Sequence, residues 1–208
     1  MRSVAQTSIG DTVRGAVLAG EARAAAESVG SGTALAQAGY ALGLALEGTD
    51  QDEALGHLET AARFAAAAGN RWIEAFALTE VHSLRARRGE HVAGLAGFGE
   101  VVRTWYRGGD WANQWLSLRH VFGVLVDLGA FEVAAVLHGA LTGAGAAHAL
   151  PFEPADAQRL DAIVVDLRSL LGNAYFVAAV GRGASMTDSE IVEYLIDQID
   201  ELAGPGGD

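Results

Sequence analysis

Glycines recur at nearly constant spacing through the first two thirds of this chain. They stand at positions 10, 30, 48, 69, 89, 109 and 129, so that successive positions differ by 20, 18, 21, 20, 20 and 20. The stretches between them are rich in alanine and leucine and have helical periodicity. Glycine readily takes the left-handed conformation that often follows a helix, so each step predicts one helix of about four turns and a short turn. The alternative is a chance pattern among 27 glycines.

Two steps together give a period of about 40 residues, which is typical of helical-repeat proteins. Ala54, Gly94 and Ala134 recur at this period, and larger or apolar residues follow each of them at similar distances. Asn70 and Asp110 are predicted N-caps of two first helices of pairs. We therefore predict an all-α fold: a tetratricopeptide-like stack of antiparallel helix pairs with a C-terminal helical cap.

The same pattern predicts where the helices and domains begin and end. The stack should cover residues 1–150, and capping helices in the same structural unit should cover 151–208. The first helix matches the second helix of a pair, so the chain is expected to begin halfway through a pair and to expose an apolar edge. The expected helices are 11–28, 33–46, 51–68, 71–87, 90–107, 111–128, 131–142, 155–171, 173–182 and 187–203.

Composition excludes several kinds of chemistry. The chain has no cysteine and no lysine, which excludes thiolate metal sites, cysteine nucleophiles, Schiff bases and the lysine of a phosphate-binding loop. Its formal net charge of −12 disfavours direct contact with nucleic acid. No run of apolar residues is long enough for a membrane span or a signal peptide, so we expect a cytoplasmic protein. We expect no cofactor and no enzymatic activity.

The C-terminal third departs from the repeat period of the preceding helices. Thr187 and Glu190 have the spacing of a capping box, and an amphipathic helix follows them, with Glu193, Asp197, Asp200 and Glu201 expected to face water. This helix is interpreted as a cap, with an acidic partner-docking face as the alternative.

Several segments carry a resemblance that covers most of the chain: EALGHLETAARFAAAAGNRWIEAFAL and GDWANQWLSLRHV, and Leu170-Leu171-Gly172, Phe176, Ala179, Gly183, Thr187 and Glu190. They resemble the C-terminal region of large bacterial regulators, which join an ATPase domain to helical repeats. Some of these regulators carry a LuxR-type DNA-binding domain, and others carry an adenylate-cyclase-like domain or a transcriptional activator domain. No ATPase, cyclase or DNA-recognition motif is present in this sequence. The resemblance thus implies a sensor or scaffold region that has no catalytic residues and whose partners include upstream ATPase or output domains.

Aromatic residues recur at helical spacing in two of the predicted first helices. Trp72 and Phe76 are four residues apart, and Trp111 and Trp115 repeat this spacing one period later. They form either the core between repeats or a groove, because the first helices of tetratricopeptide pairs line a concave surface. The predicted binding residues of such a groove are Trp72, Phe76, Trp111, Gln114, Trp115 and Arg119.

Other polar groups have simpler interpretations. No two of the six histidines have the spacing of metal ligands on one helix, so no metal site is predicted, although His120 and His138 could meet across a hairpin. The acidic run 50–53 is expected to form the first turn of a helix capped by residue 49 or 50. The arginines at 85, 87 and 88 are expected to stabilise a helix C-terminus, with an anion-binding or interdomain patch as the alternative.

Three functions are compatible with these features. The first is a non-catalytic module that binds a protein or peptide within a bacterial transcriptional or signalling regulator. The second is a small helical enzyme or ligand-binding protein with a pocket between the repeats and the C-terminal helices. The third is a homodimer that uses the exposed N-terminal edge.

Overall fold

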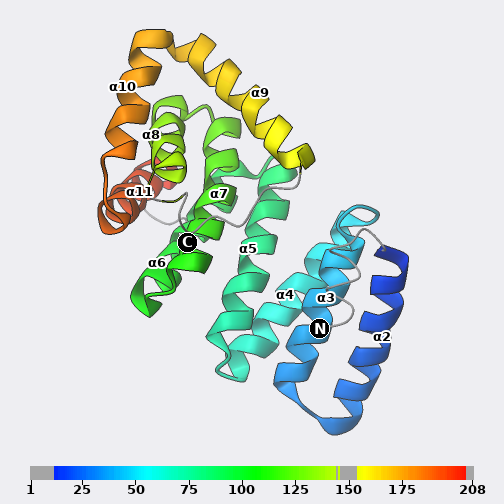
Figure 1. Ribbon diagram of the computed structural model, residues 1–208. Helices are drawn as coiled ribbons and strands as arrows, with labels where there is room; N and C mark the ends of the chain where they lie inside the picture. Colours follow the sequence, from blue (N-terminus) through cyan, green and yellow to red (C-terminus); the bar gives the residue numbers. More distant parts are fainter. Residues whose placement is uncertain (1–11, 144, 146–153, 205–208) are drawn as a thin grey trace. The chain divides into compact units, whose positions relative to one another are not determined.

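The computed structural model describes residues 12–143, 145 and 154–204. These residues form ten α-helices and no strand, which confirms the all-α prediction (Figure 1). All the predicted helices are present, and their ends agree with the prediction within two residues. The helices are α2 (Thr12–Val29), α3 (Gly32–Leu46), α4 (Gln51–Ala67), α5 (Arg71–Arg87), α6 (His91–Gly108), α7 (Trp111–Asp127), α8 (Phe131–Thr142), α9 (Pro154–Leu171), α10 (Asn173–Ala184) and α11 (Asp188–Ala203).

Four helix N-termini have the capping chemistry that the sequence predicts for them. Asn70 and Asp110 each accept a hydrogen bond from the backbone N–H three residues later, at 3.1 and 3.2 Å, and Asp50 caps α4 in the same way at 3.0 Å. Thr187 and Glu190 form both hydrogen bonds of the predicted capping box. These N-caps are confirmed, and they fix the first residue of each helix and hence which side chains share a face.

The glycine prediction is confirmed at five helix ends and wrong at one. The glycines that follow α2, α4, α5, α6 and α7 all have positive φ: Gly30, Gly69, Gly89, Gly109 and Gly129. Gly48 does not: α3 ends at Leu46, its C-cap Glu47 has right-handed helical geometry, and the backbone N–H groups of Thr49 and Asp50 donate to the carbonyl of Leu46. Gly10 lies outside the described residues.

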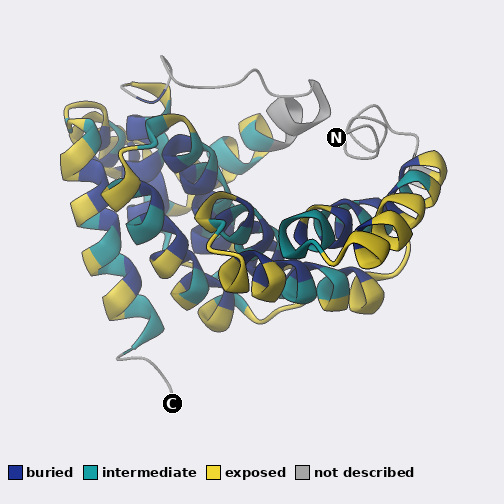
Figure 2. Ribbon diagram, turned by 90° about the horizontal axis from the view of Figure 1, so that it is seen from below, coloured by how far each residue is buried: buried dark blue, intermediate teal, exposed yellow. Residues whose placement is uncertain are grey.

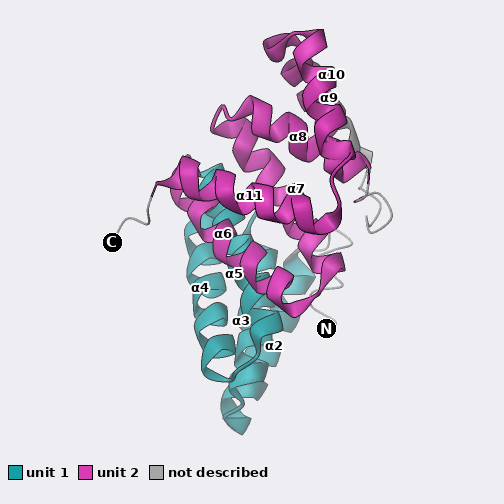
Figure 3. Cartoon of the chain, turned by 90° about the vertical axis from the view of Figure 1, so that its left-hand side faces the viewer, with its two compact units in different colours: residues 1–88 teal, residues 89–208 magenta. Residues whose placement is uncertain are grey.

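The chain divides into two compact units, residues 1–88 and 89–208 (Figure 3). The predicted boundary at residue 150 falls in 146–153, outside the described residues. The predicted small residues Ala54, Gly94 and Ala134 are all buried. The tetratricopeptide-like stacking of successive pairs stays a prediction.

Unit 1 contains α2–α5. Helix α3 packs between α2 and α4, and α5 packs mainly on α4 while also touching α3. Buried and exposed residues form separate faces along these helices (Figure 2). Small side chains let α3 and α4 approach closely, since a Cβ on Gly43 would lie 2.6 Å from Leu58 Cδ2. The core is mainly alanine, and its buried clusters contain Ala36, Ala54, Leu58, Ala61, Ala62, Ala65, Ile73, Ala77, Val81 and Leu84.

Unit 2 contains α6–α11, and α8 and α10 cross at close range within it. Gly139 of α8 and Gly183 of α10 face each other's helix backbone: a Cβ on Gly139 would lie 2.8 Å from the carbonyl carbon of Val180, and one on Gly183 would lie 2.7 Å from that of Val136. These distances are well inside van der Waals contact. Two glycines therefore permit this crossing, and no larger residue fits at either position without moving a helix.

Helix α11 returns to pack against α6 and α8, which supports its interpretation as a cap. Its apolar residues Ile191, Leu195 and Ile199 are buried. Glu193 and Asp200 are exposed, as expected, and both also bind α6: Asp200 accepts from Arg103 Nη2 at 2.6 Å, and Glu193 accepts from the Tyr106 hydroxyl at 2.9 Å. The acidic side of α11 thus anchors the helix within its own unit.

Candidate binding surface on α3 and α5

Three aromatic rings form a row where α3 and α5 meet in unit 1. Trp72 and Phe76, one turn apart on α5, meet edge to face with ring centroids 4.4 Å apart. The ring of Phe76 lies 6.4 Å from that of Tyr40 on α3. Trp72 is 56% exposed, whereas Phe76 and Tyr40 are half-buried. This aromatic row (Tyr40, Phe76 and Trp72) leads from the α3–α5 contact out to solvent.

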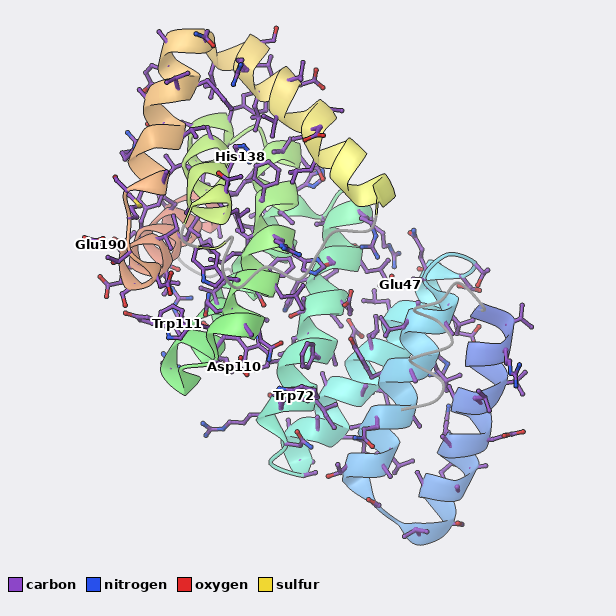
Figure 4. The ribbon with its side chains drawn as sticks, in the orientation of Figure 1. Glu47, Trp72, Asp110, Trp111, His138 and Glu190 are labelled. Atoms are coloured by element: carbon purple, nitrogen blue, oxygen red, sulfur yellow. The ribbon has the colours of Figure 1, made fainter. Side chains whose placement is uncertain are left out.

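Two carboxylates continue from the inner end of the aromatic row. Glu80 follows Phe76 by about one turn of α5, and Glu47 is the C-cap of α3. Glu47 Oε1 lies 3.2 Å from Arg87 Nη2, near the C-terminus of α5. Because Trp72 is in the first turn of α5, Glu47 and Trp72 mark opposite ends of the surface (Figure 4). We call Glu47 and Glu80 the carboxylate pair.

Burial and neighbouring charges raise the pKa of two groups on this surface. Burial raises the pKa of Tyr40, and the charges of Glu80 and Glu47 raise it further. Burial also raises the pKa of Glu80 to about 7, with an added contribution from the charge of Glu47, while Arg87 opposes the shift. The pKa of Glu80 is therefore about 7, and the Tyr40–Phe76 and Glu47–Arg87 contacts between α3 and α5 place the aromatic row beside the carboxylate pair.

Helix geometry explains why these residues share a side. The Asn70 cap starts α5 at Arg71, so Trp72, Phe76 and Glu80 follow at intervals of four residues and stay on one side of the helix. Another side of α5 supplies the buried residues Ile73, Ala77 and Leu84 to the core of unit 1. On α3, Tyr40 and Glu47 are separated by about two turns.

The structure places the six predicted groove residues in different surroundings. Trp72 and Phe76 lie in unit 1, in the aromatic row. The other four lie on α7 in unit 2, where Gln114 and Trp115 are only 0% and 2% exposed. Trp111 is half-buried and meets the ring of Tyr106 edge to face at 5.9 Å. Arg119 is also half-buried, and burial lowers its pKa.

Gln114 is unusual among the buried residues of α7. Neither its amide nitrogen nor its amide oxygen has a hydrogen-bond partner among the described residues. A buried polar group without a partner destabilises a fold by about 1–3 kcal/mol. Since Gln114 and Trp115 lie in the interior, they are not positioned to meet a large partner at the surface.

The remaining polar candidates take part in the packing of the helices. Arg85, Arg87 and Arg88 form ion pairs with Glu59, Glu47 and Asp52, at 2.7, 3.2 and 2.8 Å. The ring of His138 lies between those of Phe122 and Phe176, at 6.1 and 6.4 Å. No group of three potential metal ligands occurs in the described part of the chain.

Sequence reasoning identified the outer end of this surface and missed the inner end. Tyr40, Glu47 and Glu80 were not predicted as site residues. For Glu80 a signal was present, because it continues the spacing of Trp72 and Phe76 by one more turn. For Tyr40 and Glu47 the sequence holds no comparable signal, since their proximity to Glu80 depends on how α3 packs beside α5.

No protein-family model, curated protein or solved structure matches this chain. Within the described ranges, no helix is both long enough and apolar enough to cross a bilayer.

Proposed function

We propose that this chain is a non-catalytic interaction module that binds a peptide segment of a partner protein on the α3–α5 surface. The observation that carries the proposal is Trp72, a tryptophan 56% exposed at the end of a row of aromatic rings. Tryptophan and tyrosine are enriched among the residues that dominate binding energy at interfaces.

The exposed part of Trp72 is large enough to matter for binding. A tryptophan offers up to about 250 Å² of surface, so the exposed fraction is on the order of 140 Å². Covering this area would contribute about 3.5 kcal/mol at about 25 cal/mol per Å². Edge-to-face contact with Phe76 restricts the ring in the free protein, which reduces the entropy lost on binding.

The sequence resemblance supports a second part of the proposal. The helical repeats of large bacterial regulators resemble residues 34–129 of this chain, so the partner is proposed to belong to a transcriptional or signalling system. An ATPase or output domain of such a regulator is one candidate. The geometry of the α3–α5 surface supports peptide binding independently of this context.

The proposal can be tested by selecting peptides from a random displayed library on the intact chain. Selected peptides should bind Trp72→Ala at least about tenfold more weakly than the unmodified chain, since about 1.4 kcal/mol corresponds to a factor of ten. Phe64→Ala is the matched control, because Phe64 is an exposed aromatic residue on α4 and lies outside the aromatic row. Selection of no peptide, or equal binding to Trp72→Ala, would refute the proposal.

A further inference from the structure

The α3–α5 surface contains a carboxylate that the described part of the chain leaves without a partner. Glu80 is half-buried, yet it makes no hydrogen bond or ion pair with any described residue. The arginines nearest in sequence do not supply one, since Arg85 is paired with Glu59 and Arg88 with Asp52. Arg87 is the exception, because its charge acts on Glu80, but its ion pair is with Glu47.

Two neighbouring groups also have unused capacity for hydrogen bonds. Glu47 Oε1 is buried and receives no hydrogen bond, although Arg87 Nη2 lies 3.2 Å away. The Tyr40 hydroxyl makes no hydrogen bond to any residue that the structure describes. Together with Glu80, these groups offer several acceptor atoms and one hydroxyl at the inner end of the aromatic row.

This set of groups fits a cation. Among the described residues, Arg87 is the arginine whose charge acts on both carboxylates, and it is paired with Glu47, so the local charge without a ligand is negative. A half-buried carboxylate is stabilised by an opposite charge. The faces of tyrosine and tryptophan attract guanidinium and ammonium groups as well. An anionic segment would instead meet like charges, and the net charge of −12 favours the approach of basic partners.

We infer that the peptide bound on the α3–α5 surface places an arginine or lysine side chain against Glu80 and Glu47, and an apolar side chain against Trp72. This inference rests on the proposed function and adds the chemistry of the partner. The basic side chain of the peptide binds mainly to the unpaired Glu80 carboxylate, while Arg87 stays paired with Glu47. Trp72 then contacts the apolar side chain of the peptide, and the carboxylate pair binds the positively charged side chain.

A double-mutant cycle tests the inference. Peptides selected on the intact chain are synthesised with their basic residue and with glutamine in its place, and both forms are titrated against the unmodified chain and Glu80→Gln. The basic peptide should lose about ten- to a hundredfold in affinity for Glu80→Gln, the range of a hydrogen bond between charged groups. The glutamine peptide should bind both proteins within about twofold. Glu59→Gln is the matched control, because it removes the same charge from α4 and should leave binding unchanged.

The outcomes separate this inference from the proposed function. If the selected peptides depend on Trp72 but lack a basic residue, or bind Glu80→Gln as tightly as the unmodified chain, the cation site is refuted and peptide binding stands. Equal losses for the basic and glutamine peptides would show that Glu80 acts only through the fold, which also refutes the site. If no peptide depends on Trp72, both proposals are wrong.

Discussion

The crossing of α8 and α10 gives a sharp prediction about stability. Replacing Gly183 by alanine adds a Cβ that would lie 2.7 Å from the carbonyl carbon of Val136 and 3.1 Å from the backbone nitrogen of Ala140. Carbon atoms pack at about 3.5–4.0 Å, so the two helices must separate by about 1 Å. The atoms in the way belong to a helix backbone, which cannot rotate aside as a flexible side chain does.

The magnitude follows from two opposing effects. Overpacking a core by one methyl group destabilises by about 1–3 kcal/mol, and a gap of about 1 Å elsewhere in the interface removes up to half of each local dispersion contact. Alanine in a helix is favoured over glycine by about 0.5–1 kcal/mol. We expect Gly183→Ala to lower the free energy of unfolding by about 2 kcal/mol and the melting temperature by roughly 4–8 °C.

Urea unfolding followed by circular dichroism measures this change. Gly181→Ala is the matched control, because Gly181 is on the same helix and nothing lies within 4 Å of its added Cβ. It should stabilise the chain by about 0.5–1 kcal/mol. Gly139→Ala should resemble Gly183→Ala, and the double variant should lose less than the sum, because helices already separated make room for the second methyl group. If Gly183→Ala proves as stable as Gly181→Ala, the close crossing of α8 and α10 is refuted.

Three further predictions concern other sites. Glu80→Gln should match the unmodified chain in stability near pH 4.5 and exceed it above pH 7 by at most about 3 kcal/mol. Burial raises the pKa of Glu80 to about 7, so the native state of the unmodified chain binds more protons than the unfolded state between pH 4.5 and 7. The stability of the unmodified chain therefore falls as the pH rises through this range. A pH-independent difference in urea titrations would contradict this. Gln114→Leu should raise the unfolding free energy by about 1 kcal/mol, because two unpaired buried polar atoms disappear; a loss of stability would show that Gln114 has a partner. Asp200→Ala should lower it by about 0.5–1 kcal/mol through loss of the 2.6 Å contact with Arg103, while Asp197→Ala, also on α11, should change it less.

The fold was largely predictable because its signals are local. Each N-cap lies three residues from the N–H that it accepts, and each helix-ending glycine acts within its own turn, so Asn70, Asp110 and Gly109 could be interpreted from the sequence alone. Gly48 shows the limit of this reasoning. A glycine shortly after a helix permits the left-handed conformation but does not require it, and α3 ends at Leu46 without it.

The candidate surface was less predictable because it depends on contacts between distant segments. Sequence spacing placed Trp72 and Trp115 in one aromatic pattern, yet the first is exposed and the second is buried. Whether such a residue is buried depends on which other helix packs against its face of the helix. The periodicity of a sequence does not identify that other helix. The ion pair between Glu47 and Arg87 likewise joins α3 and α5, which are separated in the sequence by the whole of α4, and no sequence motif predicts it.

We propose that the α3–α5 surface binds a basic peptide segment. The most direct measurement is a crystal structure of the intact chain with the tightest peptide selected on it. We expect the peptide to cover Trp72 and to place an arginine or lysine nitrogen about 3 Å from a carboxylate oxygen of Glu80. A peptide bound at another surface, with Trp72 still exposed, would refute the proposed site.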